Sequence, residues 1–282
     1  MWVIGHECGH SAFSSHKWVC DVIGFVTHTF FWTPYFSWRI SHHRHHSNHA
    51  SMEKDEVYVP KSRSDLGLPQ EKHSVKIDYD ELLGDTPIYT LLVLLRQQML
   101  DSLRTSCSMY LGRRRIQSEQ IILIRNAVYM SNTGIFAMII GVVVSSNIWG
   151  FGEVVKYYYI PWLCVSNWFI MITYRGAACT VDRDFPGWQG RFFLHDVTHF
   201  HIVHHFFPQM PFYHGPEATE YLKAFIGEHY AYSNAPVFKQ LWETYKFCQF
   251  VEDDGDVVFY RNEHGKTVRR LAGDYTPQNK EA

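Results

Sequence analysis

Histidines are the side chains of this sequence whose type and spacing point to chemistry. The chain has 18 histidines in 282 residues, and many of them gather in three short clusters. The first cluster is His6-Glu-Cys-Gly-His10, the second is His42-His-Arg-His-His46, and the third is His201-Ile-Val-His-His205. In a helix, residues spaced i, i+3 and i+4 share one face, so the three imidazoles of an H-x-x-H-H pattern are expected to converge. Converging imidazoles indicate a metal site.

The two H-x-x-H-H patterns are too many to be accidental. With histidine at 18 of 282 positions, roughly 0.07 such patterns are expected in a random chain of this composition. Counted over all three clusters, eight imidazoles exceed the four ligands of one tetrahedral zinc ion, and a two-metal site would use them. These candidate metal ligands are His6, His10, His42, His45, His46, His201, His204 and His205. Imidazole suits iron, zinc, copper and nickel alike, so the ligand type leaves the metal open.

The first cluster alone has a competing interpretation. It matches H-E-x-x-H, the zincin pattern in which two histidines bind zinc and the glutamate is the general base. That interpretation leaves the second and third clusters unused, and nothing in the sequence identifies the third zinc ligand that it requires. For any single histidine, the alternative is an ordinary core or surface residue. Taken together, the clusters favour one shared metal site.

The composition restricts the class of partner. A formal net charge of -2 provides no basic surface of the kind that nucleic-acid binding needs. The six cysteines include no C-x-x-C pair, which fits neither a disulfide scaffold nor a zinc finger. The hydrophobic share of 46% suits a large core or a membrane-embedded one. We therefore expect no nucleic-acid partner, and reduced thiols that face cytosol or lipid.

Two uncharged segments predict a transmembrane helical hairpin at about 127–174. Residues 127–149 and residues 157–174 contain no charged side chain, and only a short turn separates them. Aromatic residues crowd the turn, as in an aromatic belt, while arginines precede the first segment and follow the second, which places both outer ends in the cytosol. A buried hairpin of a soluble protein is the alternative. Uncharged segments of this length are typical of membrane helices.

The segment between the first two clusters, residues 18–38, is apolar but is interrupted by an aspartate, a histidine and a proline. If the two clusters serve one site, this segment crosses the membrane zero or two times, and about 20 residues allow only one crossing. We expect it to be interfacial or re-entrant. Residues 52–85 are expected to be a soluble connection, residues 87–100 a helix too short to span, and residues 216–230 an amphipathic helix. The charged tail from Val251 is expected to be partly strand or disordered.

Four stretches together resemble the membrane-bound fatty acid desaturases, most closely the fungal delta-12 (oleate) type. They are HECGH, HHRHH followed by SNHASMEKDEVYVPK, TVDRDFPGW, and HDVTHFHIVHHFFPQMPFYHGPEAT. The match covers most of the chain. The three clusters correspond to the histidine boxes of that family, so the resemblance implies that the eight candidate histidines hold two iron ions. His43 and Ser11 stand where relatives often carry other residues, and neither is carried over as a ligand.

The resemblance implies a diiron enzyme of the endoplasmic reticulum membrane. It would take electrons from cytochrome b5 and its NADH-dependent reductase, and use O2 to remove two hydrogens from an oleoyl chain, giving linoleoyl. A hydroxylase, epoxygenase or conjugase on the same scaffold is a related alternative, because these enzymes would share the metal site. A desaturase fragment unable to hold both irons is the alternative of a different class. No catalytic residue is assigned beyond the metal ligands.

The chain also departs from that family. Relatives usually carry a further transmembrane hairpin before the first cluster, whereas Met1 here lies five residues before His6. They also carry a histidine in an L-Q-H-T-like stretch at a place where Tyr174 here runs directly into Arg175, and residues 101–120 fit the family poorly. We therefore expect the sequence to be truncated at its N-terminus and internally, as an incomplete or mis-spliced gene model would be. Sequencing the transcript tests this expectation.

The expected architecture is an all-α, polytopic membrane protein with one desaturase domain over residues 1–282. The hairpin carries a cytosolic histidine-box cap, and the C-terminal segment 206–282 is also cytosolic. Near the third cluster, two acidic residues either orient ligating histidines or lie in a solvated loop, and two histidines either add a ligand or flank the cluster. These residues are Asp182 and Asp184, and His195 and His199, of which His195 is the favoured extra ligand.

Overall fold

The computed structural model describes residues 1–55, 59–69, 92, 121–173, 181–183, 190–192, 195–262 and 264–267. Within these ranges the chain is mostly helical, and its one sheet is a parallel pair of two-residue strands, β1 (Asp182–Arg183) and β2 (Tyr232–Ser233). The expectation of a helical chain is therefore confirmed for the described residues. Apart from Leu92, the predicted helix at 87–100 lies outside them, and so do residues 101–120, which fit the family poorly.

The N-terminal helices are α1 (Trp2–Gly9), α2 (Lys17–Phe30) and α3 (Tyr35–Asn48). They share a small core of buried side chains, which are Cys8, Cys20, Tyr35, Phe36 and Trp38. Helix α3 begins directly after Pro34, whose ring permits a first helical turn but no continuation from α2.

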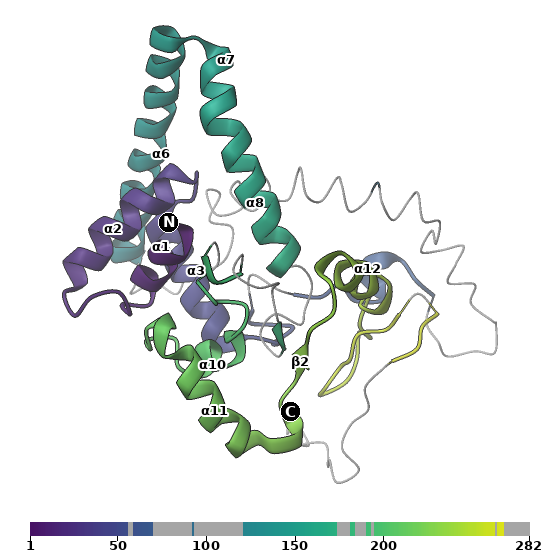
Figure 1. Ribbon diagram of the computed structural model, residues 1–282. Coiled ribbons are helices and arrows are strands. Elements are labelled where there is room, and N and C mark those ends of the chain that lie inside the picture. Colours follow the sequence, from purple (N-terminus) through teal and green to yellow (C-terminus); the bar gives the residue numbers. More distant parts are fainter. Residues whose placement is uncertain are drawn as a thin grey trace.

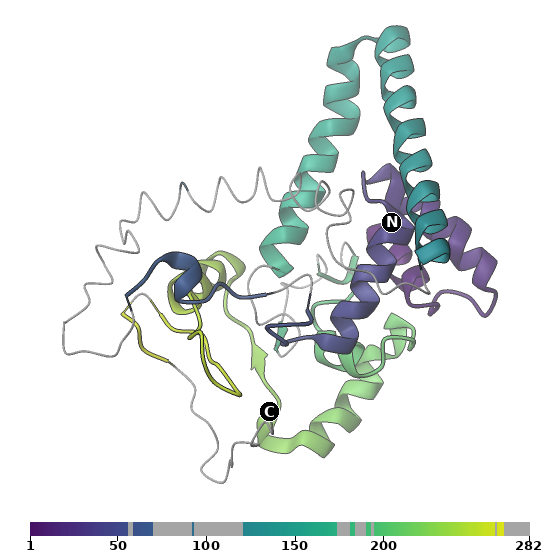
Figure 2. The ribbon, with the colours of Figure 1, turned by 180° about the vertical axis from the view of Figure 1, so that it is seen from behind.

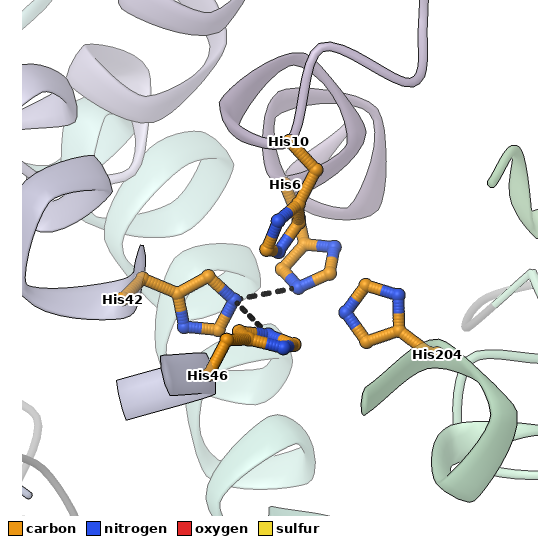
Figure 3. Close-up of side chains that lie close together, drawn as sticks. All are labelled: His6, His10, His42, His46 and His204. Carbon is orange, nitrogen blue, oxygen red and sulfur yellow. Dashed lines mark hydrogen bonds between the residues drawn. The ribbon is translucent and has the colours of Figure 1, made fainter. Parts of the chain in front are cut away.

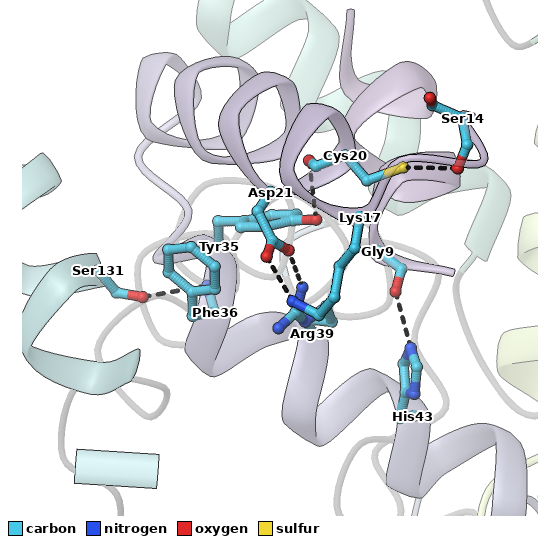
Figure 4. A network of polar contacts seen from close by, with 10 residues as sticks. All are labelled: Gly9, Ser14, Lys17, Cys20, Asp21, Tyr35, Phe36, Arg39, His43 and Ser131. Atoms are coloured by element: carbon cyan, nitrogen blue, oxygen red, sulfur yellow. Dashed lines mark hydrogen bonds and ion pairs between the residues drawn. The ribbon is translucent and has the colours of Figure 1, made fainter. Parts of the chain in front are cut away.

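Polar contacts hold these helices together (Figure 4). On the outside of the core, Asp21 pairs with Lys17 at 2.5 Å and with Arg39 of α3. Inside it, the Tyr35 hydroxyl donates to the carbonyl oxygen of Cys20 at 3.2 Å. The relative placement of α2 and α3 is therefore defined from both sides.

The segment predicted to be interfacial is a helix, a turn and a second helix. Helices α2 and α3 have 14 residues each, fewer than the roughly 20 that a crossing requires. Along α2, large apolar side chains recur every fourth position and are exposed, namely Trp18, Val22, Val26 and Phe30. Such a stripe is typical of a helix that lies in a membrane interface. The interfacial placement itself stays a prediction.

The hairpin projects from the rest of the chain as two long antiparallel helices (Figures 1 and 2). The first is α6 (Ile121–Trp149), and the second runs through α7 (Phe151–Val154), one π-helical turn η2 (Val155–Tyr159) and α8 (Ile160–Thr173). The predicted turn is shorter than expected, because the chain reverses at Gly150 with φ of 93° and is helical again from Phe151. A glycine suits this left-handed backbone because it has no Cβ.

Helix α6 is a candidate membrane span by its length and apolar composition. Residues Asn126–Trp149 are long and apolar enough to cross a membrane, and only 17% of that stretch is buried. A core helix of a soluble protein would be mostly buried. Among the described residues, α6 is the one helix that meets the length and apolarity required of a span, and the two crossings of the predicted hairpin stay a prediction. Two aromatic side chains near the turn instead bind the end of α2, since Tyr158 and Trp162 donate to the carbonyl oxygens of Phe30 and Phe31.

The C-terminal part carries the third cluster. Helix α10 (His201–Phe206) packs against α11 (Gly215–Ile226), and α12 (Val237–Phe247) follows β2. Short 3-10 turns lie at Ser64–Leu66, Phe212–His214 and Gly227–His229. The predicted amphipathic helix is thus confirmed as α11 with its following turn.

The charged tail forms isolated bridges to earlier parts of the chain. Val251 pairs with Ser62, and Arg261 pairs with both Phe250 and Thr267. Strand-like structure in the tail was expected, and these bridges confirm part of it. Residues 268–282 lie outside the described ranges.

Candidate metal centre

Three helices that are far apart in the sequence bring their histidines to one point. Helix α1 carries the first cluster, α3 the second and α10 the third. Helices α1 and α3 approach closely at Gly9, where an added Cβ would stand 2.6 Å from the ring of Trp38. The glycine of the first cluster therefore allows α1 to lie against α3, which brings their imidazoles within reach of one another.

Five histidines form a compact group, which we call the five-histidine site (Figure 3). One ring nitrogen of each lies within 4.8 Å of those of all the others, and the members are His6, His10, His42, His46 and His204. The rings point toward one another from α1, α3 and α10. The closest pairs join Nε2 of His42 to Nε2 of His6 at 2.9 Å and to Nε2 of His46 at 3.2 Å. Three clusters thus contribute to a single site.

The other three predicted ligands lie beside this site and not within it. Nε2 of His205 is 3.2 Å from Nε2 of His201. The His205 ring stacks on His46 with centroids 4.2 Å apart, and its centroid is 5.3 Å from that of His45. The shared H-x-x-H-H spacing is therefore used differently in the two clusters. In the second the i and i+4 residues enter the five-histidine site, and in the third the i+3 residue does.

The pKa values of four histidines of the site are lowered far enough to favour the neutral imidazole at pH 7, and these four are His10, His42, His46 and His204. Removal from water lowers the pKa of His10, His42 and His204 well below the usual 6.5, and neighbouring imidazoles lower it further. The same two causes lower the pKa of His46 to about 2. A neutral imidazole has a lone pair to donate, and this is the form that binds a metal ion.

The donor atoms fit a metal ion. Nε2 of His10 and Nε2 of His204 are buried and have no hydrogen-bond partner within the described structure. A buried polar atom without a partner is destabilising by about 1–3 kcal/mol, and coordination would satisfy both atoms. An all-imidazole set suits iron, zinc, copper or nickel. Five donors also exceed the four of a closed structural zinc site.

The contacts of Glu7 in the first cluster do not suit the general base of a zincin. Glu7 is 3% exposed; its Oε1 is 3.3 Å from Nδ1 of His6, and its Oε2 accepts the backbone N–H of Phe212 at 3.1 Å. Both oxygens are therefore engaged, one by the first cluster and one by the chain just after the third. This geometry supports an orienting role, and the zincin interpretation, which needs a general base, loses its support.

Asp182 is buried and accepts a hydrogen bond from the backbone of α10, the helix that carries the third cluster. Its Oδ1 accepts the backbone N–H of Ile202 at 2.8 Å, and its Oδ2 accepts the hydroxyl of Tyr230 at 2.5 Å. Of the two alternatives for this residue, a solvated loop is therefore wrong. The contact is to the first turn of α10 and not to an imidazole, so the orientation that Asp182 provides acts on the helix. Asp184 lies outside the described residues.

The two histidines before α10 flank the site. The His195 ring lies 5.6 Å from that of Phe212, and Nδ1 of His199 is 3.1 Å from Oδ1 of Asp196. Neither belongs to the five-histidine site. The preference for His195 as a further ligand gains no support from this placement.

Asp55 is a buried partner of the second cluster that was not predicted from the sequence. It lies in the segment assigned as a soluble connection, yet its side chain is fully buried and its Oδ2 is 2.8 Å from Nδ1 of His45. No periodicity marks this residue, because the partner is ten positions earlier and the chain between them is a turn. A carboxylate shortly after a histidine cluster was the only available sign.

Comparison with known proteins identifies the family of this chain. The family model for fatty acid desaturases matches residues 1–236. A Delta(12) fatty acid desaturase of Mortierella alpina is 35% identical over 294 residues, covering 93% of this chain and 73% of the relative. An oleoyl-12-hydroxylase of Ricinus communis is 35% identical, covering 94% and 73% respectively. An omega-6 fatty acid desaturase of the endoplasmic reticulum from Brassica juncea is 34% identical, covering 90% and 70%. With three histidine clusters that meet at one point and a family match over most of its length, the chain belongs to the fatty acid desaturase family.

Proposed function

We propose that this protein is a delta-12 desaturase that converts an oleoyl chain to a linoleoyl chain. The observation that carries the proposal is the five-histidine site, assembled from all three clusters in a chain similar to Delta(12) desaturases over most of its length. The reaction removes one hydrogen from each of two neighbouring methylene carbons and reduces O2 to two waters with two electrons and two protons. Cytochrome b5 and its NADH-dependent reductase are the proposed electron donors.

The proposed ligand set divides into two neighbouring groups. The five-histidine site would hold one iron, and His45, His201 and His205 would supply ligands to a second. The two groups are in contact where the ring of His46, from the five-histidine site, stacks on the ring of His205. When bound, the irons supply the O2-dependent oxidising power that removal of hydrogen from an unactivated carbon requires.

The protein's own contribution is to hold these side chains and exclude water. His6, His10 and His204 are each less than 10% exposed, so solvent has little access to the donor atoms. The lowered pKa values of His10, His42, His46 and His204 favour neutral imidazoles, which bind a metal ion without prior loss of a proton. Exclusion of water would also protect a reactive oxidant from side reactions.

The proposed location is the endoplasmic reticulum membrane, with the three clusters facing the cytosol. Support comes from the apolar, largely exposed helix α6 and from the similarity to the endoplasmic reticulum desaturase of Brassica juncea. The distribution of arginines around the hairpin favours cytosolic outer ends.

A hydroxylase is the second candidate. Relatives named as hydroxylases are about as similar as the desaturases, since the Ricinus communis protein is 35% identical over 94% of this chain. Both outcomes would use the same histidines and differ in how the acyl chain is positioned. The spacing of the ligands does not separate them.

Expression in a yeast that makes oleate but no linoleate tests the proposal. Fatty acid analysis should show linoleate; a 12-hydroxy product would establish the hydroxylase instead, and no new product would support an inactive fragment. The purified chain should contain about two irons. His204→Ala should abolish the product and lower the bound iron, whereas His229→Ala, at an exposed turn, should change neither. Unchanged iron in His204→Ala would refute its role as a ligand.

A further inference from the structure

The segment after α3 folds back so that an acidic side chain reaches the second cluster. The reversal occurs at Ala50, whose φ of 64° is in the left-handed region. Backbone hydrogen bonds from Ser51 to Asn48 at 3.0 Å and from Asp55 to Ser51 at 3.3 Å then define a compact turn. This turn carries Asp55 back to the last turns of α3, beside His45.

The contact between Asp55 and His45 is short, and both side chains are buried away from water. Nδ1 of His45 lies 2.8 Å from Oδ2 of Asp55, and the two side chains are 2% and 0% exposed. A carboxylate accepts and does not donate when ionised, so the imidazole must carry its proton on Nδ1. The lone pair of His45 is then on Nε2. The contact therefore fixes both the tautomer and the rotation of this ring.

The ring orientation matters because of what surrounds His45. The His205 ring lies 5.3 Å away, centroid to centroid, and His205 in turn contacts His201 through Nε2 at 3.2 Å. His45 is thus the one predicted ligand of the second cluster that lies outside the five-histidine site and beside this pair. A ligating histidine usually donates its second ring N–H to a carboxylate or carbonyl, which holds the ring and raises its basicity.

Burial of a carboxylate is costly, which makes a purely structural role a poor explanation. Transfer of a carboxylate out of water costs several kcal/mol even after the protein relaxes. A hydrogen bond to a histidine offsets only part of this desolvation free energy. Orientation of a metal ligand is a function for which such a pair is used. The first cluster shows a similar arrangement, since Oε1 of Glu7 lies 3.3 Å from Nδ1 of His6.

We propose that Asp55 is a positioning residue that holds His45 as an Nε2 ligand for the second metal, together with His201 and His205. This inference rests on the proposed function, which requires two irons. It assigns a role to a residue outside the three clusters. It also predicts that loss of Asp55 affects one of the two metals more than the other.

The test compares variants of the full chain, purified in detergent and loaded anaerobically with 57Fe(II). Asp55→Leu should raise the dissociation constant of the iron held by His45, His201 and His205 by about 10- to 100-fold, while the iron of the five-histidine site stays bound. Mössbauer spectra should then lose one component. Asp55→Asn retains an oxygen that can accept from Nδ1, so its loss of affinity should be smaller. Glu53→Gln removes the same charge from an exposed position of the same turn and should match the wild type.

A double-mutant cycle separates orientation from a general effect on stability. If Asp55 acts through His45, then Asp55→Leu should cause no further loss of iron in a His45→Ala chain. Additive losses would overturn the inference, as would a folded Asp55→Leu or Asp55→Asn chain that binds both irons with wild-type affinity and spectrum. A wild-type chain that binds no second iron would overturn the proposed function and this inference together. The wild-type measurement therefore identifies which of the two has failed.

Discussion

Replacement of Asp182 by alanine should loosen the third histidine cluster without touching a metal ligand. Asp182 is fully buried and is held in β1 by the pairing of that strand with β2. Its carboxylate receives two hydrogen bonds, from the backbone N–H of Ile202 and from the hydroxyl of Tyr230. Asp182→Ala leaves both donors without their acceptor.

The magnitude follows from the surroundings of each donor. Ile202 is 5% exposed, so its N–H would remain buried and unsatisfied, which costs about 1–3 kcal/mol. Tyr230 is only partly buried and its hydroxyl can turn to water, so we assign about 1 kcal/mol to its lost bond. The sum is about 2–4 kcal/mol, and about 3 kcal/mol corresponds to roughly a 100-fold change in a local opening equilibrium.

Hydrogen exchange measured by mass spectrometry on the peptide that spans α10 tests this estimate. In Asp182→Ala the amides of α10 should exchange about 100-fold faster, and iron binding should weaken. Tyr230→Phe removes only the second hydrogen bond and should raise the exchange rate less than tenfold. Unchanged exchange in a folded Asp182→Ala chain would refute the view that this carboxylate holds the helix.

Two further predictions concern pH and packing. Burial lowers the pKa of His28 to about 3, from 6.5, so its contribution to stability is complete above pH 6.5 and is lost as the pH falls toward 3. Between pH 7.5 and 5.5 this residue should lower the free energy of unfolding of the metal-free chain by about 1.4 kcal/mol, and His28→Phe should make the measured pH dependence shallower by that amount; an unchanged slope would contradict the assignment. Gly24→Ala should destabilise by about 1–3 kcal/mol or more, because its new methyl would stand 2.2 Å from a buried tyrosine ring. Gly141→Ala, whose methyl would meet nothing within 4 Å, is the matched control, and equal thermal midpoints for the two variants would count against the packing argument.

The three histidine clusters and the hairpin could be predicted from the sequence because both depend on local patterns. Helical spacing determines which imidazoles share a face, and a long uncharged segment determines where a helix can cross a membrane. The described structure bears out helix α6, the amphipathic helix α11 and the meeting of the three clusters. The second helix of the hairpin differed in one respect. Residues assigned to the loop are helical from Phe151, because one glycine suffices for the reversal.

The division of the eight histidines into five and three could not be predicted from their spacing. His45 and His204 occupy the same i+3 position in identical patterns, yet His204 enters the five-histidine site and His45 turns to Asp55. The choice depends on how each helix is rotated about its axis. For α3 that rotation depends on contacts with Gly9 and with α2, which no local pattern encodes.

The sequence by itself indicated that this protein binds metal, because three clusters of histidines at helical spacing favour a shared metal site. Only the tertiary structure decided which distant groups the carboxylates near the histidine clusters contact. Glu7 reaches Phe212, Asp182 reaches Ile202 and Asp55 returns to His45, over 205, 20 and 10 positions. Such contacts form when helices pack and turns close, and their partners are neighbours in space without being neighbours in any helical repeat.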